Sequence, residues 1–147
     1  IGIPLLESVG MSSQRLTLFQ LAAAYAVALV VMGALDGVWL GWLAKDFYRE
    51  QLGALMTDSV RIVPAAIYYL GFPAVIVYLA LTPAASLGEA VLRSAVLGLA
   101  AFGVYDLTNL AILRGYTLTM TVVDMAWGTF ATAVGGAAAY QAVMAPR

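Results

Sequence analysis

Four long apolar segments, separated by short polar stretches, constrain this chain more than any other feature. They cover residues 16–43, 62–82, 90–113 and 118–144. A helix that crosses a membrane needs about 20 mostly apolar residues, and each segment is that long. Only 10% of the residues are charged, whereas a soluble domain carries about 25%, so lipid must face most of the surface. The sequence predicts an all-α, integral membrane four-helix bundle with four transmembrane helices.

The stretches between these segments predict how the helices connect. "AKDFYREQLGALMTDSVR" (residues 44–61) places Tyr48, Leu52, Leu55 and Met56 on one helical face. This pattern predicts a short amphipathic helix at the membrane interface, directly after the first span. "RGY" at residues 114–116 leaves room only for a tight turn. The third and fourth spans should therefore be antiparallel neighbours.

The chain divides into two unequal parts. Residues 1–15 are expected to be an N-terminal extension, and residues 16–147 a single transmembrane domain. The opening "IGIPLLESVG" lacks the basic residues and the long apolar run of a signal peptide. Lysine and arginine are divided almost evenly between the two sides of the predicted bundle, so the positive-inside rule does not fix its orientation.

Three acidic residues lie inside the apolar segments: Asp36, Asp106 and Asp124. Each lies eight or nine residues from one face of the membrane, which Lys45, Arg114 and Tyr116 mark. At the helical rise per residue this is about 12–13 Å, close to the middle of a hydrocarbon core about 30 Å thick. We therefore expect the three carboxylates at one level near mid-membrane.

Polar companions accompany these acids. One helical turn later on the same face stand, in order, Trp39, Asn109 and Trp127. Indole N–H and carboxamide groups can donate hydrogen bonds to an ionised carboxylate. In the second span, Pro73 has no N–H, so the carbonyl of Tyr69 loses its helical partner. Tyr69 is expected to add this carbonyl and its phenol to a ligand-binding site.

The acids require a compensating arrangement. A carboxylate at the bilayer centre costs about 2.5–3.5 kcal/mol, and no Lys, Arg or His lies at that level. Either the acids are protonated and hydrogen-bonded, or a cation lies between them, with Asp36, Asp106 and Asp124 as its candidate ligands. Oxygen ligands favour a hard cation. The chain has no Cys and no His, so no haem or zinc is expected.

Two ridges of small residues recur every fourth position. Small residues at this spacing let helices approach closely in lipid. The ridges serve either packing within the bundle or a homo-oligomer interface. Their members are Gly33, Gly37 and Gly41 in the first span and Gly128, Thr132 and Gly136 in the fourth.

Several stretches resemble a known family: "LDGVWLGW", "KDFYREQLG", "YYLGFP", "VYDLTNLAILRGY" and "VVDMAWGT". They are similar to the bacterial predicted-membrane-protein family catalogued as domain of unknown function 2177, from Met11 onward. The resemblance implies a multi-pass, four-helix protein of the bacterial inner membrane. It implies no activity, so it assigns no catalytic residue.

Three functions remain open. The first is binding or translocation of a small cation, a proton or a small ligand, and the acids and the broken helix favour it. The second is an intramembrane enzyme acting on a lipid or isoprenoid, with Asp106 and Asp124 as an acid–base pair. The third is a structural or accessory membrane subunit. The net charge of −1 and the absence of a basic tract exclude nucleic acid as a partner, and leave membrane lipid and a second copy of the chain.

Overall fold

A computed structural model describes residues 16–144, so the expected N-terminal extension lies outside the described residues. The regular secondary structure of the described part is all helical, without a strand. Its α-helices are α1 (Leu18–Val38), α2 (Lys45–Leu52), α3 (Ile62–Val75), α4 (Leu87–Ile112) and α5 (Leu118–Ala139). Three of them continue into π-helical turns, which are η1 (Trp39–Leu43), η3 (Ile76–Leu81) and η4 (Tyr140–Met144), and a short 3-10 turn, η2 (Gly53–Leu55), follows α2.

Side-chain caps fix where the long helices begin. The hydroxyls of Thr17, Ser86 and Thr117 each accept a hydrogen bond from a backbone N–H in the first turn of α1, α4 and α5, which satisfies a donor that has no partner within the helix. Gly115 has a φ of 82°, a conformation that only glycine adopts readily. This glycine permits the tight turn between α4 and α5 that the sequence predicted.

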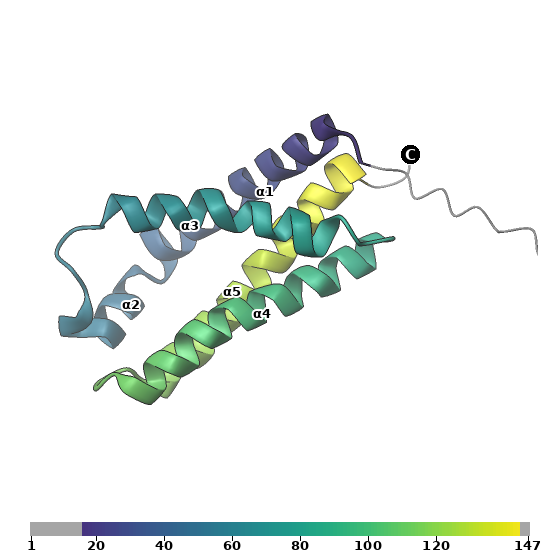
Figure 1. Ribbon diagram of the computed structural model, residues 1–147. Helices are drawn as coiled ribbons and strands as arrows, with labels where there is room; N and C mark the ends of the chain where they lie inside the picture. The colour runs from purple at the N-terminus through teal and green to yellow at the C-terminus, as the bar shows by residue number, and fades with distance from the viewer. Residues whose placement is uncertain (1–15, 145–147) are drawn as a thin grey trace, which may run out of the picture.

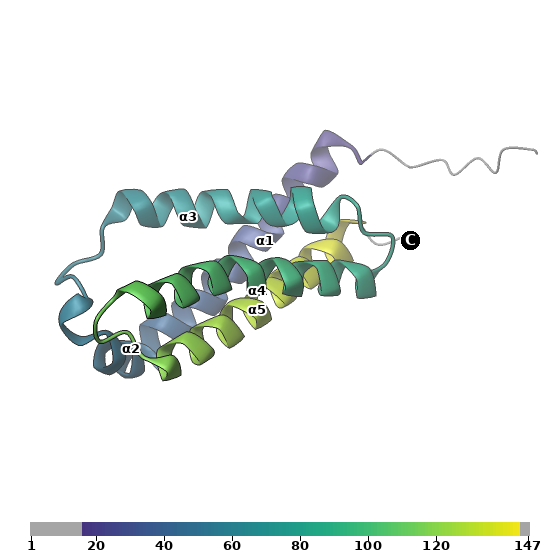
Figure 2. The ribbon, with the colours of Figure 1, turned by 60° about the horizontal axis from the view of Figure 1, so that its bottom comes forward.

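The central helix of the bundle is α5. It packs against α4 along its length and against α1, and Figures 1 and 2 both show α4 and α5 side by side. In contrast, α3 packs mainly against α1, and its continuation η3 makes most of the packing against α4. The helices α3 and α4 therefore meet at their connecting turn and diverge toward α2 (Figure 1). The short helix α2 lies at that open end and contacts α5.

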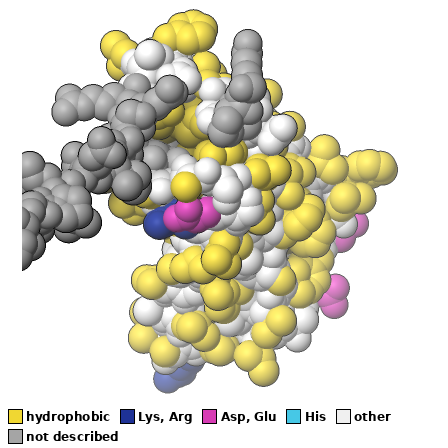
Figure 3. All heavy atoms as spheres, turned by 90° about the vertical axis from the view of Figure 1, so that its right-hand side faces the viewer, with side chains coloured by type: hydrophobic (Ala, Val, Ile, Leu, Met, Phe, Trp, Pro, Cys, Tyr) yellow, Lys and Arg dark blue, Asp and Glu magenta, His cyan; other side chains and the backbone are white. Residues whose placement is uncertain are grey.

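Three helical stretches are long and apolar enough to cross a membrane. They are Leu18–Leu43, Ile62–Leu81 and Leu87–Ile112. Among the residues described, α5 does not reach the same apolarity, although it was the fourth predicted span. The physical reason is its position, because much of its surface is buried against other helices and needs no lipid-compatible side chains. Elsewhere many large hydrophobic side chains are exposed, and Figure 3 shows such side chains spread over one end of the bundle with few charged ones among them.

The ridge of small residues on α5 serves packing within the chain. A Cβ atom at Gly128 would collide with the ring of Phe102, and one at Gly136 would collide with Ser94, both on α4. Thr132 is fully buried, and its hydroxyl donates to the Gly128 carbonyl over 2.6 Å. Glycine is needed here because α4 and α5 approach too closely for a side chain.

The ridge on α1 behaves differently. Its three glycines are exposed, and a Cβ atom at any of them would meet nothing within 4 Å. The ridge therefore takes no part in packing among residues 16–144, and its use as a homo-oligomer interface stays a prediction. Its members are Gly33, Gly37 and Gly41.

Candidate functional site

The three acids of the apolar segments come together in one cluster. Asp36 (α1), Asp106 (α4) and Asp124 (α5) are buried, with exposed fractions of 5%, 0% and 8%. Asp124 interacts electrostatically with both of the others. We call these three residues the acidic cluster. Three different helices thus bring acidic groups to one place inside the bundle.

Each carboxyl group accepts a hydrogen bond from an aromatic side chain. The Trp127 indole donates to Asp36 Oδ1 over 2.9 Å. The Tyr116 hydroxyl donates to Asp106 Oδ1 over 2.5 Å, and the Tyr48 hydroxyl donates to Asp124 Oδ1. The donors to Asp36 and Asp124 come from α5 and α2, and the donor to Asp106 comes from the turn that follows α4. All three acids are therefore held by specific donors.

The companions predicted within each helix do not pair as expected. Trp127 donates to Asp36 instead of Asp124, and Trp39 donates to Tyr48. Asn109 lies beside Tyr105 and Tyr116, and the donor to Asp106 is Tyr116. The reason is geometric, because side chains one turn apart project from the same helix face in similar directions. The donors that point toward the carboxyl groups come from other parts of the bundle, which face the helix that carries the acid.

Two tryptophans link the donors to one another. Trp39 and Trp127 stack with ring centroids 4.4 Å apart, and the Trp39 indole donates to the Tyr48 hydroxyl over 3.1 Å. Trp39 therefore acts on Asp124 through Tyr48. The stack joins η1 to α5 beside the acidic cluster.

The tyrosines act as donors because they keep their protons. Burial, followed by the hydrogen bond to Asp124, raises the pKa of the Tyr48 hydroxyl. Burial, followed by the hydrogen bond to Asp106, also raises the pKa of Tyr116. Both effects disfavour a phenolate anion, so each phenol donates and each carboxyl oxygen accepts.

The cluster lies toward the α2 end of the bundle. Asp106 is within the last two turns of α4, Asp124 is within the first two turns of α5, and Asp36 is in the last turn of α1. At this end Tyr48 on α2 and Tyr116 in the turn donate hydrogen bonds to two of the acids. The common level near mid-membrane stays a prediction.

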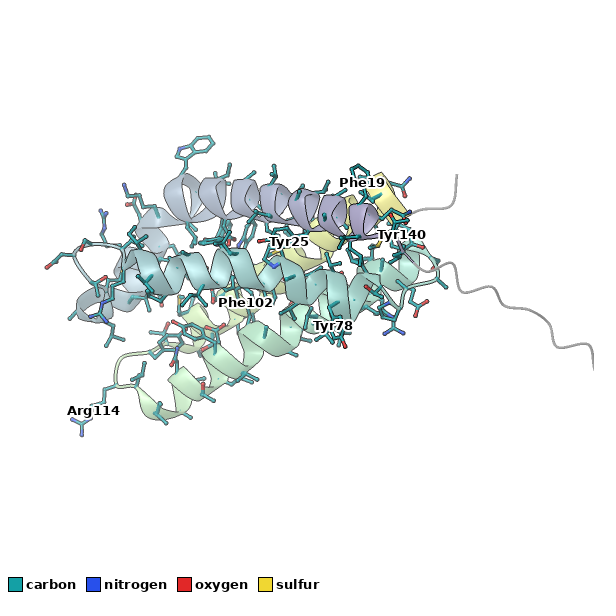
Figure 4. All side chains as sticks on the ribbon, turned by 45° about the horizontal axis from the view of Figure 1, so that its top comes forward. Phe19, Tyr25, Tyr78, Phe102, Arg114 and Tyr140 are labelled. Atoms are coloured by element: carbon teal, nitrogen blue, oxygen red, sulfur yellow. The ribbon has the colours of Figure 1, made fainter. Side chains whose placement is uncertain are left out.

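A cleft of about 640 Å³ opens beside the cluster and is lined by all five α-helices and η1. Asp36 and Asp124 line it, whereas Asp106 does not, and no Lys or Arg among residues 16–144 contributes to its lining. Arg114 extends away from the bundle (Figure 4). Most of the other lining side chains are apolar, and the aromatic ones are Tyr48, Tyr68, Tyr69, Phe72, Phe102, Tyr105 and Trp127.

The second span contributes aromatic side chains to the cleft, and its helix is not interrupted at Pro73. Pro73 lies inside α3, which continues to Val75 before it becomes π-helical. The Tyr25 hydroxyl donates to the Leu70 carbonyl over 2.9 Å, next to the predicted break. Tyr69 lines the cleft beside Asp36. The Tyr68 hydroxyl is buried without a hydrogen-bond partner, which the sequence did not indicate.

Residues 21–141 match the family of predicted membrane proteins DUF2177. The chain belongs to this family. The matched DUF2177 region contains the whole acidic cluster and every residue that lines the cleft. No curated protein and no solved structure matches the chain. Family membership thus establishes a membrane protein and leaves its activity to be inferred from the site.

The acids of this DUF2177 chain do not form a ready-made metal centre. Residues 16–144 contain no group of three or more His, Cys, Asp or Glu side chains placed to hold a metal ion. Each acid directs one oxygen to an aromatic donor instead. A hard cation shared by all three acids therefore finds no preformed set of ligands in this part of the chain.

Proposed function

We propose that this protein binds a small, positively charged ligand in the cleft, beside Asp36 and Asp124. The observation that supports this most directly is the lining: two buried carboxyl groups face a space of about 640 Å³ that no basic side chain enters among the residues described. A cation in that space would satisfy both acids. Binding sites in proteins are commonly apolar concave spaces with a few convergent polar groups.

Energetics favour a ligand over a purely structural role. A carboxylate within a membrane costs about 2.5–3.5 kcal/mol, whereas a polar contact between membrane helices returns about 0.6 kcal/mol on average. Asp106 lies outside the cleft, so the acid–base pair that an enzyme would need does not face a substrate. These features favour reversible binding, to which translocation would add a further step.

The proposal includes four membrane crossings. The helix α5 is connected to α4 by a short turn and lies against it along its length, so it crosses wherever α4 crosses. The chain has no Cys, which allows single reactive sites to be introduced. Arg114→Cys and Gln141→Cys lie at opposite ends of the α5–η4 stretch. They should react with an impermeant maleimide from opposite sides of the membrane, and labelling from one side would contradict a fourth crossing.

Calorimetric titration in lipid nanodiscs with tetraethylammonium tests the ligand. We expect Asp36→Asn and Asp124→Asn to weaken binding about tenfold or more, which corresponds to 1.4 kcal/mol or more. Asp46→Asn is the matched control, because Asp46 is an exposed acid on α2 outside the cleft. Equal affinity in all four proteins, or no binding by the wild type, would overturn the proposal.

A further inference from the structure

We propose that the ligand of the cleft is a lipophilic organic cation, meaning a quaternary or delocalised cation with an apolar body. The inference rests on the proposed function and names its ligand class. Size is the first argument, since a cleft of about 640 Å³ falls within the range of about 300–1,000 Å³ that holds drug-sized molecules. A bare inorganic ion would fill little of it.

The aromatic walls give the second argument. Tyr68 and Phe72 on α3 stack with ring centroids 5.5 Å apart, and Phe72 meets Phe102 of α4 edge-on at 6.5 Å. The Phe102 ring extends from α4 into the interior of the bundle (Figure 4). Aromatic faces attract organic cations through their quadrupoles and also bury apolar groups. The walls therefore suit a ligand that is charged and apolar at once.

Access gives the third argument. The cleft has lining residues on α3 and on α4, and these two helices diverge toward α2 (Figure 1). Both helices also carry apolar side chains on their exposed surface, such as Ile67 on α3 at 70% and Val104 on α4 at 69%. In a membrane such side chains face lipid. A ligand that partitions into the bilayer can therefore enter sideways, between the two helices.

Two ions with the same shape and opposite charge test whether the ligand is a lipophilic organic cation. Tetraphenylphosphonium and tetraphenylborate are titrated into the full-length protein in nanodiscs, with empty nanodiscs as the blank. We expect tetraphenylphosphonium to bind about tenfold or more tightly than tetraethylammonium, because apolar burial adds to the charge interaction, and tetraphenylborate not to bind. If tetraethylammonium binds and tetraphenylphosphonium binds no more tightly, this inference fails while the proposed function stands. If the borate binds equally well, charge plays no part and both fail.

Substitutions in the aromatic walls of the cleft measure how much these walls contribute to binding. Tyr68→Leu should weaken tetraphenylphosphonium binding about three- to tenfold, in line with loss of one cation–π contact, whereas Tyr68→Phe should retain most of it. Tyr78→Leu is the control, because Tyr78 is 75% exposed and outside the cleft. An equal loss in Tyr68→Leu and Tyr78→Leu would overturn the assignment of the aromatic walls.

A separate observation concerns the acid that does not line the cleft. Asp106 is fully buried, one of its oxygens accepts from Tyr116, and its Oδ2 has no hydrogen-bond partner. The groups that interact with it are Asp124 on α5, Tyr48 on α2 and Tyr116 in the turn, with Tyr105 beside them on α4, and none of these is a cation. Among residues 16–144 the ion pair found is Arg93–Glu89, near the other end of α4.

We infer that Asp106 holds a proton on Oδ2 and donates it to Asp124. A buried carboxylate without a counter-ion is costly, whereas the acid form makes the unpartnered oxygen a donor toward a neighbouring acceptor. The Asp106–Asp124 pair then carries one negative charge, and Asp124 presents that charge to the cleft. Asp106 is thus a positioning residue for Asp124.

Infrared spectroscopy of the protein without a ligand tests whether Asp106 is protonated. The wild type at neutral pH should show the C=O stretch of a buried protonated carboxylic acid, which shifts in D₂O. Asp106→Asn should remove the band, Asp124→Asn should shift it, and Asp36→Asn should leave it unchanged. Absence of the band from the wild type, or its persistence in Asp106→Asn, would overturn the inference.

Discussion

Trp39 and Trp127 stack with their ring planes 7° from parallel and their centroids 4.4 Å apart. The Trp127 N–H holds Asp36, and the Trp39 N–H holds Tyr48, which in turn donates to Asp124. One aromatic stack therefore orients both carboxyl groups that line the cleft. It also joins the end of the first span to α5.

Replacing Trp127 by Phe keeps a ring in the stack and removes the donor to Asp36. We expect a loss of about 1–3 kcal/mol of stability, because the buried Asp36 is left without this donor, together with weaker cation binding. Thermal unfolding and calorimetry measure the two effects. Trp42→Phe is the control, because Trp42 is 76% exposed, and an equal change in that variant would contradict a specific role for Trp127.

The glycines of the two ridges should respond oppositely to alanine. Gly128→Ala forces a Cβ atom into the ring of Phe102, and such overpacking costs about 1–3 kcal/mol. Gly37→Ala meets nothing within 4 Å and should be neutral or slightly stabilising, since alanine is the better helix former. Denaturant titration in mixed micelles compares the two. Equal destabilisation would show that the α1 ridge also packs against a partner.

The sequence predicted some helices of the bundle more fully than others. Length and apolarity were enough to predict the spans over α1, α3 and α4. Lipid requires apolar side chains at the positions that face it, so these spans are visible as long apolar segments in the sequence. The same signal is weaker in α5, since its surface is buried against other helices. The sequence also predicted a short helix where α2 lies, but α2 ends at Leu52, so Leu55 and Met56 do not share its face. Tyr48, which looked like an interfacial residue, is buried at 8% exposure against Asp124.

The partners of the acids could not be read from spacing. One-turn neighbours were visible in the sequence, but Trp127 reaches Asp36 across the bundle, and such pairing depends on how the helices are rotated. The cleft depends equally on the divergence of α3 from α4, so Tyr68 and Phe102 gave no signal. Tyr116 could have been found, because a tyrosine in a tight turn lies within reach of the last turn of the helix before it.

Tyr48 should give the protein an alkaline limit of stability. The folded state raises the pKa of this hydroxyl, so it binds the proton more tightly than the unfolded chain does. The resulting stability is fully present below pH about 10, the ordinary value for tyrosine, and is lost as the pH rises above it. Tyr48→Phe should show a shallower decline above that pH in thermal unfolding. Tyr78→Phe, at an exposed position, should decline like the wild type, and identical curves for all three proteins would contradict the effect.

Tyr116 and Asp106 should be energetically coupled. Tyr116→Phe leaves the buried Asp106 without its donor and should cost about 1–3 kcal/mol. Asp106→Leu leaves the phenol without its acceptor, but the double variant should lose less than the sum of the two, because both polar groups are then gone. A thermodynamic cycle from unfolding data measures the difference. Strict additivity would mean that the 2.5 Å contact contributes nothing.

The position of a heavy-atom cation in a crystal shows whether a lipophilic cation binds in the cleft. Crystals of the protein grown with tetraphenylarsonium would show the arsenic by its anomalous scattering. We expect one peak inside the cleft, among Asp36, Asp124 and Tyr68, which disappears in Asp124→Asn. A peak on the outer face of α1 along the exposed glycines, or no peak at a concentration that saturates binding, would contradict it.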